Sequence, residues 1–363
     1  MLYLSGIVVT FFLAALLIGK RGKSEADHWL AAWLTAVGLH LSSFYLYISG
    51  QSYSHPFLLG LEIPFPLLHG PFLFLYTKAL TRQPIPAWSR WAHFLPFLVV
   101  NVLLIPFLME SPDHKIYVYQ HQGAGYETMK GGTLIAIVIS GITYVVLSLQ
   151  SLARHRLLVQ NQYSSVEKVN LAWLRYLIFG LAVIWVSMAF REDTILFTIV
   201  VVYVILLGYF GIKQVGIFTQ PTAIAPVMEP ASARPKYQKS SLDQAGAEKI
   251  HRSLQELMAN AKRYTDPELT LSDLAKDLNI HPNHLSQVIN TFEGKTFYDY
   301  VNTLRIEEFK RVAPLEESQR FTLLGLANNC GFNSKTSFNR NFKQATGLSP
   351  TEYLRQSHIL LKD

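Results

Sequence analysis

The chain reads CGFNSKTSFNRNFKQATGLSP from Cys330 to Pro350, and this stretch decides the fold of its C-terminal part. Phe338 and Phe342 are four residues apart and therefore share one face of a helix. Gly331 suits a buried turn before that helix, and Gly347 suits its C-terminal stop. We predict a short polar helix that packs on a core and turns its other face toward an anionic partner. The residues of that face and its N-terminal end are Asn333, Ser334, Lys335, Thr336, Asn339, Arg340 and Lys343.

A weaker copy of this pattern lies upstream. Thr270 and Asp273 form a capping-box pattern at a helix start, and Asn279 tolerates the left-handed backbone of a sharp turn. Pro282 suits the first position of a second helix, which Gly294 ends. Asn and Gln amides match the major-groove edge of adenine, and this helix carries three of them. Its outward residues are Asn283, His284, Ser286, Gln287, Asn290 and Thr291.

Two further helices complete this region. The stretch Leu242–Ala261 has apolar residues at helical spacing, and we expect it to pack within the chain rather than on a second copy. A connecting helix from Phe297 to Val312 ends before Pro314, which cannot continue it. A second helix–turn–helix unit then begins at Thr322.

The last hundred or so residues resemble the double helix–turn–helix domain of the AraC/XylS transcription regulators. The resemblance implies two recognition helices, Pro282–Phe292 and Ser334–Thr346, each entering a major groove about one turn apart. His281 stands at an N-cap where Ser or Asp is common, and Pro314 shortens the connecting helix. The matching residues are Leu271–Ala275, Leu285–Ser286, Gly294–Phe297, Arg305–Glu308, Gly331–Ser334, Phe338, Phe342–Lys343, Gly347, Ser349–Pro350 and Tyr353.

The charge distribution is compatible with a DNA partner. Residues 240–363 carry 15 basic and 15 acidic side chains, so the region is neutral as a whole. Between Ser318 and Thr351, however, four basic residues occur without an acidic one. Phosphate neutralisation supplies much of the affinity of a protein for DNA. We expect double-stranded promoter DNA as a partner, with a second copy of the chain and RNA polymerase as further candidates.

The first two hundred residues are apolar enough to suggest a membrane domain. Crossing the hydrocarbon core needs about 20 apolar residues. Lys and Arg favour cytoplasmic loops. Alternate loops carry 11 and 3 of them, which predicts an N-terminus outside and a cytoplasmic C-terminal half. The combination resembles the membrane-embedded branch of the AraC/XylS family. The seven candidate spans are about 2–19, 29–48, 57–79, 91–109, 132–153, 171–189 and 194–212.

Few polar residues lie inside these spans, and such residues are candidates for function. Glu62 lies beside Pro64 and Pro66, which would break or kink the helix, and His69 follows. We take Glu62 and His69 as candidate signal-sensing residues. The alternative is that Glu62 reaches interfacial water and the histidines pack between helices. The loop 110–130 is rich in Tyr and His, so it caps a ligand pocket, binds a metal or forms an interfacial aromatic belt.

The chain is therefore predicted to be all-α. A seven-helix transmembrane sensor domain (1–216) precedes a proline-rich linker (217–241) and a DNA-binding domain (242–363, core about 262–358). The single cysteine, Cys330, excludes an internal disulfide and a Cys-rich metal site. No cofactor, metal site or catalytic constellation is predicted.

The predicted function is a multi-pass transcription regulator in the bacterial inner membrane that senses a membrane or extracytoplasmic signal. The signal itself is not identified by the sequence. The alternative is a membrane transporter or membrane enzyme whose DNA-binding tail regulates its own expression.

Overall fold

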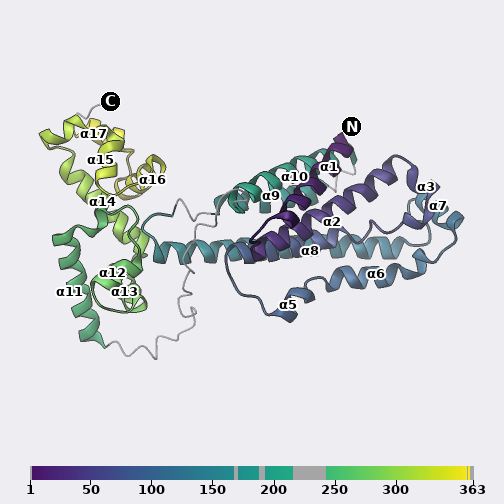
Figure 1. Ribbon diagram of the computed structural model, residues 1–363, viewed down its shortest axis with the longest axis horizontal. Helices are drawn as coiled ribbons and strands as arrows, with labels where there is room; N and C mark the ends of the chain where they lie inside the picture. The colour runs from purple at the N-terminus through teal and green to yellow at the C-terminus, as the bar shows by residue number, and fades with distance from the viewer. Residues whose placement is uncertain (1, 167–170, 188–192, 216–242, 358, 360–363) are drawn as a thin grey trace. The chain divides into compact units, whose positions relative to one another are not determined.

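The computed structural model describes residues 2–166, 171–187, 193–215, 243–357 and 359 (Figure 1). The described residues are helical, apart from connecting turns and one isolated antiparallel bridge between Tyr163 and Thr270. This confirms the predicted all-α class. The chain divides into two compact units, Met1–Arg154 with Leu171–Ile224, and His155–Asn170 with Ala225–Asp363. The predicted linker falls on residues outside the described ranges.

The N-terminal unit is a bundle of apolar helices. Helix α1 packs on α2 and α10, α2 also packs on α4, and α9 packs on α10 (Figure 1). Its core includes the fully buried Trp33, Tyr76 and Leu207. The elements that begin in this unit are α1 (Leu2–Gly19), α2 (Glu25–Ile48), α3 (Gln51–Ser54), η1 (Pro56–Leu58), α4 (Pro66–Leu80), α5 (Ala87–Ala92), α6 (Leu95–Leu108), α7 (Pro112–Gln120), α8 (Glu127–Gln162), α9 (Ala172–Ser187) and α10 (Asp193–Val215).

The predicted count of seven membrane spans is not supported. Among the described helices, α2 and α8 are long and apolar enough to cross a membrane. A third span results if α6 and α7, which meet at 113°, are counted as one. Helix α9 has 16 residues, or about 24 Å at a rise of about 1.5 Å per residue, which is short of a bilayer core of about 30 Å. The apolar stretches Tyr3–Gly19 and Ile195–Phe210 are similarly short.

The predicted span over residues 57–79 is not one helix, in agreement with the expectation that its prolines break or kink it. Helix α4 begins only at Pro66, and residues 59–65 form successive turns. Proline lacks a backbone N–H and so favours the first turn of a helix over its interior. Glu62 consequently lies in a non-helical segment before α4.

The C-terminal unit has two hydrophobic cores on either side of one long helix, α14. The first core holds Leu254 and Met258 of α11, which confirms that this helix packs within the chain. The second core holds Phe309 of α14 with Phe338 and Phe342. The elements are α11 (Gln244–Ala261), η4 (Arg263–Thr265), α12 (Leu271–Asp277), α13 (Pro282–Val288), η5 (Ile289–Glu293), α14 (Phe297–Val312), η6 (Glu316–Arg320), α15 (Leu323–Asn329), α16 (Lys335–Thr346) and α17 (Pro350–Gln356).

The first helix–turn–helix unit follows its predicted local signals. Thr270 and Asp273 form the capping box at the start of α12. Asn279 has φ +55° in the turn, and Gly294 has φ +64° after η5. Helix α14 ends at Val312, as predicted from Pro314. The second half of the first recognition helix is one π-helical turn, η5, which the sequence pattern did not predict.

The second unit also follows its predicted pattern. Ser334 caps α16 by accepting from the Ser337 N–H at 3.1 Å, and Gly347 ends the helix with φ +77°. Gly331 combines φ +97° with a close approach: an added Cβ would lie 2.5 Å from the carbonyl oxygen of Tyr264 and 2.8 Å from Nε of Arg305. Only glycine fits this turn without moving its neighbours.

Gly331→Ala should destabilise the C-terminal unit far more than Gly347→Ala. Both changes place a side chain at positive φ, which costs about 1–2 kcal/mol. Gly347 has no neighbour within 4 Å of the added Cβ, whereas Gly331 faces backbone. We expect an additional loss of about 1–3 kcal/mol at Gly331 from overpacking. The measurement is hydrogen exchange of α14 and α16 amides in the full chain. Equal losses in the two variants would contradict the close approach.

Candidate nucleic-acid interface

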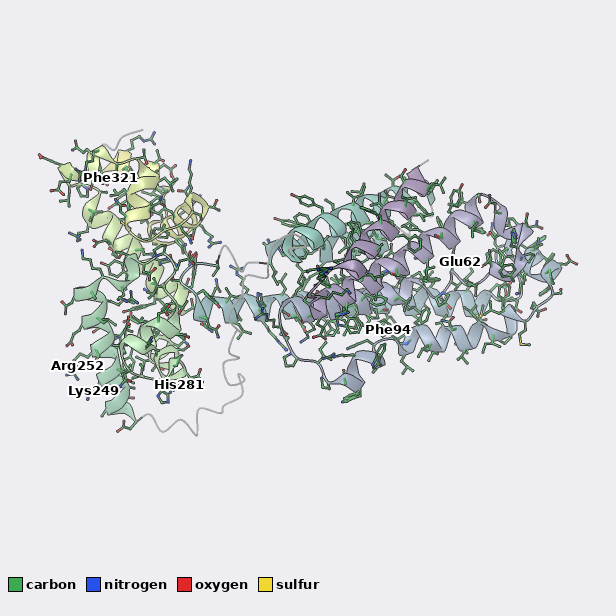
Figure 2. All side chains as sticks on the ribbon, viewed as in Figure 1. Glu62, Phe94, Lys249, Arg252, His281 and Phe321 are labelled. Carbon is green, nitrogen blue, oxygen red and sulfur yellow. The ribbon has the colours of Figure 1, made fainter. Side chains whose placement is uncertain are left out.

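The first recognition surface lies on α13 and η5. The N-cap of α13 is His281, whose Nδ1 accepts from the Asn283 N–H at 3.2 Å (Figure 2). An imidazole nitrogen therefore accepts the capping hydrogen bond that an oxygen of Ser or Asp usually accepts. Leu285, Val288 and Ile289 are buried and leave the opposite face outward. On that face Asn283, Asn290 and Thr291 are exposed, and His284, Ser286 and Gln287 are half-buried.

The second recognition surface lies on α16. Phe338 and Phe342 are buried at 1% and 0% exposure, which fixes the rotation of the helix. The predicted residues are therefore found on its outer side. Of these, Asn333, Lys335, Thr336, Arg340 and Lys343 are exposed, and Ser334 and Asn339 are half-buried.

Two of these residues have partners within the unit. Nη2 of Arg340 donates to the hydroxyl of Tyr298 at 2.6 Å, and its guanidinium lies 5.8 Å from the Tyr298 ring centroid. Nδ2 of Asn341 donates to the same hydroxyl at 2.6 Å. Nδ2 of Asn333 donates to Oγ of Ser165 at 2.7 Å. The placement of the second surface thus depends on residues outside α16.

The carboxylate of Glu308 links helix α14 to Lys262, the C-cap of α11. Glu308 of α14 accepts from Nζ of Lys262 at 2.8 Å and from Arg311 at 2.8 Å. Hydrogen bonds from Arg311, and then from Lys262, lower the pKa of Glu308 to about 2. Burial raises the pKa of the Cys330 thiol to about 12, so at neutral pH this residue is an unreactive part of the core.

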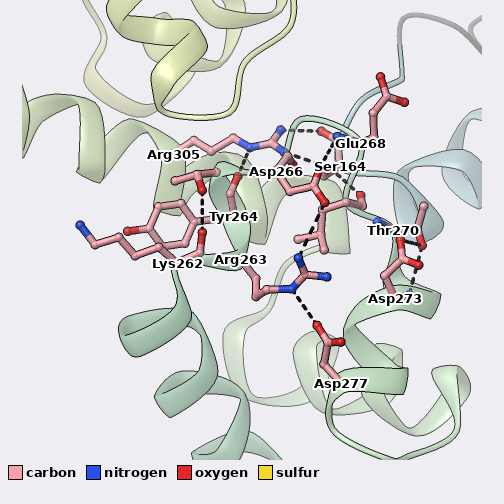
Figure 3. A network of polar contacts seen from close by, with 12 residues as sticks. Ser164, Lys262, Arg263, Tyr264, Asp266, Glu268, Thr270, Asp273, Asp277 and Arg305 are labelled. Atoms are coloured by element: carbon pink, nitrogen blue, oxygen red, sulfur yellow. Dashed lines mark hydrogen bonds and ion pairs between the residues drawn. The ribbon is translucent and has the colours of Figure 1, made fainter.

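Sequence reasoning did not identify Arg305 and Ser164 as partners. Arg305 is 1% exposed, and its Nε donates to the carbonyl of Tyr264 at 2.7 Å (Figure 3). Its Nη2 donates to the carbonyl of Asp266 at 2.7 Å and to Oγ of Ser164 at 3.1 Å. The motif containing Arg305 was visible in the sequence, but Ser164 lies 141 residues earlier and carries no local signal.

The candidate sensing residue Glu62, labelled in Figure 2, belongs to the N-terminal unit. It lines a cavity of about 370 Å³. The Tyr119 hydroxyl donates to Oε1 of Glu62, and the Gly60 N–H donates to Oε2 at 3.2 Å. The rest of the lining is mostly aromatic and aliphatic, and Tyr119 and Tyr126 from the loop 110–130 belong to it. Residues of the loop 110–130 therefore line this cavity.

The second candidate, His69, lines a smaller cavity of about 150 Å³. Its Nε2 lies 3.0 Å from Nδ1 of His40, and Nε1 of Trp33 donates to its Nδ1 at 3.4 Å. His69 thus belongs to a chain of ring contacts between α2 and α4. Among the described residues, no group of three or more His, Cys, Asp or Glu side chains is arranged to hold a metal ion.

Comparison with known proteins identifies the C-terminal region. Residues 274–356 match the model of a family described as a helix-turn-helix domain. The match supports an AraC/XylS-type helix-turn-helix domain in this part of the chain. The match begins within α12 and ends with α17, so it includes both recognition surfaces.

The relatives are similar over part of the chain. The uncharacterized HTH-type transcriptional regulator YijO of Escherichia coli K12 is 32% identical over 126 residues, which are 35% of this chain and 41% of that protein. The uncharacterized HTH-type transcriptional regulator YobQ of Bacillus subtilis 168 is 34% identical over 85 residues, which are 23% of this chain and 34% of that protein. The chain thus spans less than half the length of either relative.

A solved structure is also similar to part of the chain. The C-terminal domain of AraT, a response regulator from Geobacillus stearothermophilus, is 24% identical, covers 34% of this chain and 93% of its own, and has a TM-score of 0.26.

Proposed function

We propose that the chain is a membrane-bound transcription regulator that binds specific promoter DNA through its two recognition surfaces and senses a signal through its N-terminal unit. The observation that carries the DNA-binding part is the paired helix-turn-helix arrangement with two outward polar faces. Asn and Gln amides on the first face suit base edges, and Lys and Arg on the second suit phosphate and guanine. A second copy of the chain and RNA polymerase remain proposed partners.

The exterior of the N-terminal unit supports the membrane location. Large apolar side chains are exposed along α1, α6, α8, α9 and α10, for example Val8, Val102 and Ile139. In the described part of the C-terminal unit, only Leu157, Leu315 and Leu324 are exposed large apolar residues. A surface of that extent on one unit is typical of contact with lipid. We propose that the shorter apolar helices also lie in the bilayer, giving the seven-helix sensor.

The alternative class, a membrane transporter or enzyme with a regulatory tail, has less support. It requires paired carboxylates or a continuous polar path through the helices. The partners found for Glu62 are a tyrosine hydroxyl and a backbone amide. We therefore favour a binding role over catalysis or transport.

We propose that the cavity beside Glu62 receives the signal, an apolar or amphipathic small molecule whose polar group contacts Glu62 and Tyr119. Its volume of about 370 Å³ is within the usual range for small-molecule sites. A few polar groups in a mostly apolar wall are also typical of such sites. His69, in the neighbouring cavity, is proposed to belong to the same sensing unit.

Arg340→Ala should weaken binding to the operator by about 1–3 kcal/mol. The operator is first recovered by capturing genomic fragments with the full chain in detergent micelles, and affinity is then measured by fluorescence anisotropy. Lys310→Ala is the matched control because Lys310 lies on α14 and pairs with Glu307. Equal loss on all DNA sequences assigns Arg340 to phosphate, and relaxed preference at one base pair assigns it to that base. Absence of any fragment enrichment at low salt would refute the DNA-binding proposal.

The C-terminal end should be cytoplasmic and the loop 110–130 should lie outside. We expect β-galactosidase fused after Asp363 to be active and alkaline phosphatase at the same position to be inactive. The opposite activities are expected for insertions at Gly123, within that loop. A periplasmic Asp363 would overturn the proposed function, since no chromosomal DNA is present there.

Filling the cavity should abolish the response to the signal. Thr133 is buried and lines the cavity, so Thr133→Trp occupies much of its volume. We expect an operator-driven reporter to vary across growth media with the wild-type chain and to stay at one level with Thr133→Trp. Glu62→Gln and His69→Phe should reduce the range, and the exposed Glu127→Gln should not. A wild-type range in Thr133→Trp would remove the cavity from the proposal.

A further inference from the structure

A segment that lies between two predicted membrane spans belongs to the DNA-binding unit. Residues 155–166, here called the docking segment, comprise the end of α8 and the four residues that follow it. They group with the C-terminal unit rather than with the helices that precede them in sequence. The predicted spans on either side are 132–153 and 171–189.

Ser164 anchors the docking segment through polar contacts. It is 1% exposed, and both its N–H and its Oγ donate to the carbonyl of Leu269, at 3.2 and 2.6 Å. Its carbonyl accepts from Nδ2 of Asn302 at 3.0 Å and from Nη1 of Arg305 at 3.2 Å. Figure 3 shows Ser164 at the Arg305 guanidinium. The buried guanidinium is thus satisfied in part by the docking segment.

Apolar and main-chain contacts extend this anchor. Val159 and Val166 are 3% and 9% exposed and form one cluster with Tyr298 of α14. Tyr163 pairs through its backbone with Thr270, the N-cap of α12. The docking segment therefore contacts the first helix-turn-helix unit at the start of α12.

The docking segment also reaches the second recognition surface. Ser165 accepts the hydrogen bond from the Asn333 amide at 2.7 Å, directly before the N-cap of α16. Tyr298, which packs against Val159, accepts from Arg340 of the same helix at 2.6 Å. Asn333 thus contacts the docking segment directly, and Arg340 is linked to it through Tyr298.

We propose that the docking segment is an autoinhibitory element that competes with DNA for the second recognition surface, an inference that rests on the proposed DNA binding. The N-terminal residues of a recognition helix are the ones that approach base edges. In the docked state the Asn333 amide is engaged by Ser165, and the segment lies between the starts of α12 and α16. Promoter DNA engages α16 fully only after the segment has left.

The position of the docking segment in the sequence allows the N-terminal unit to control this competition. It is joined to proposed membrane helices at both ends, and α8 contributes residues to both units. A signal that changes the preferred position of α8 or α9 therefore changes how often the segment is docked. Ligands shift such equilibria only through unequal affinity for the two states.

The first test removes an apolar contact of the segment. Val159→Asp places a charge against Tyr298, whereas Leu157→Asp, two residues earlier on α8, places it on an exposed position. We expect Val159→Asp to bind the operator about tenfold more tightly than wild type, within the usual range for allosteric coupling, and Leu157→Asp to bind as wild type does. Full chains in lipid nanodiscs are compared by anisotropy. Unchanged or weaker binding by Val159→Asp would overturn the proposal.

A second test locks the docked state without disturbing its core. In a Cys330→Ala background, Tyr163→Cys and Thr270→Cys, which face each other across the backbone bridge and lie outside both recognition surfaces, are joined by a short reducible bis-methanethiosulfonate crosslinker. We expect operator binding to be lost on crosslinking and regained on reduction, with no such change in either single-cysteine chain. Equal binding before and after reduction would refute autoinhibition. Failure of every chain, locked or released, to bind any DNA would instead refute the proposed function.

Discussion

The buried guanidinium of Arg305 is the constraint on which the C-terminal unit depends. A charge removed from water costs several kcal/mol unless its hydrogen bonds are replaced. Here the replacements include carbonyls of Tyr264 and Asp266 and both oxygens of Ser164. These groups come from the turn after α11 and from the docking segment, while Arg305 itself is on α14. The Tyr264 and Asp266 carbonyls hold α14 to the turn after α11, and the Ser164 oxygens add the docking segment to this body while it is docked.

The second helix-turn-helix unit also packs closely against Arg305. The turn that opens α16 brings Gly331 so close to Nε of Arg305 and the Tyr264 carbonyl that no side chain fits. Phe332, the next residue, lies with its ring centroid 5.8 Å from the guanidinium. The two hydrophobic cores are separate, yet both recognition surfaces take their positions from the residues around one side chain. Specific recognition of two successive grooves requires a fixed spacing of this kind.

Features that depend on neighbouring residues could be predicted from the sequence. Contacts between residues far apart in the chain could not. Capping at Thr270, the turn at Asn279, and the start and stop of α16 follow from residues within one turn of each other. The outward faces followed from the buried stripes. Ser164 was missed because its partner lies 141 residues away and a lone serine in a loop has no pattern. Hydropathy located seven apolar stretches, but it does not set where a helix such as α4 begins, which is at Pro66.

In the proposed competition, the coupling between withdrawal of the docking segment and DNA binding is reciprocal. If withdrawal of the docking segment raises affinity for DNA by some factor, binding of DNA must favour the withdrawn state by the same factor. The state of the N-terminal unit that favours withdrawal is then itself stabilised by the operator. A ligand in the cavity beside Glu62 would bind with different affinity to the DNA-bound and DNA-free chains. If DNA takes the Asn333 amide from Ser165, as proposed, no separate relay between the two sites is needed for this coupling.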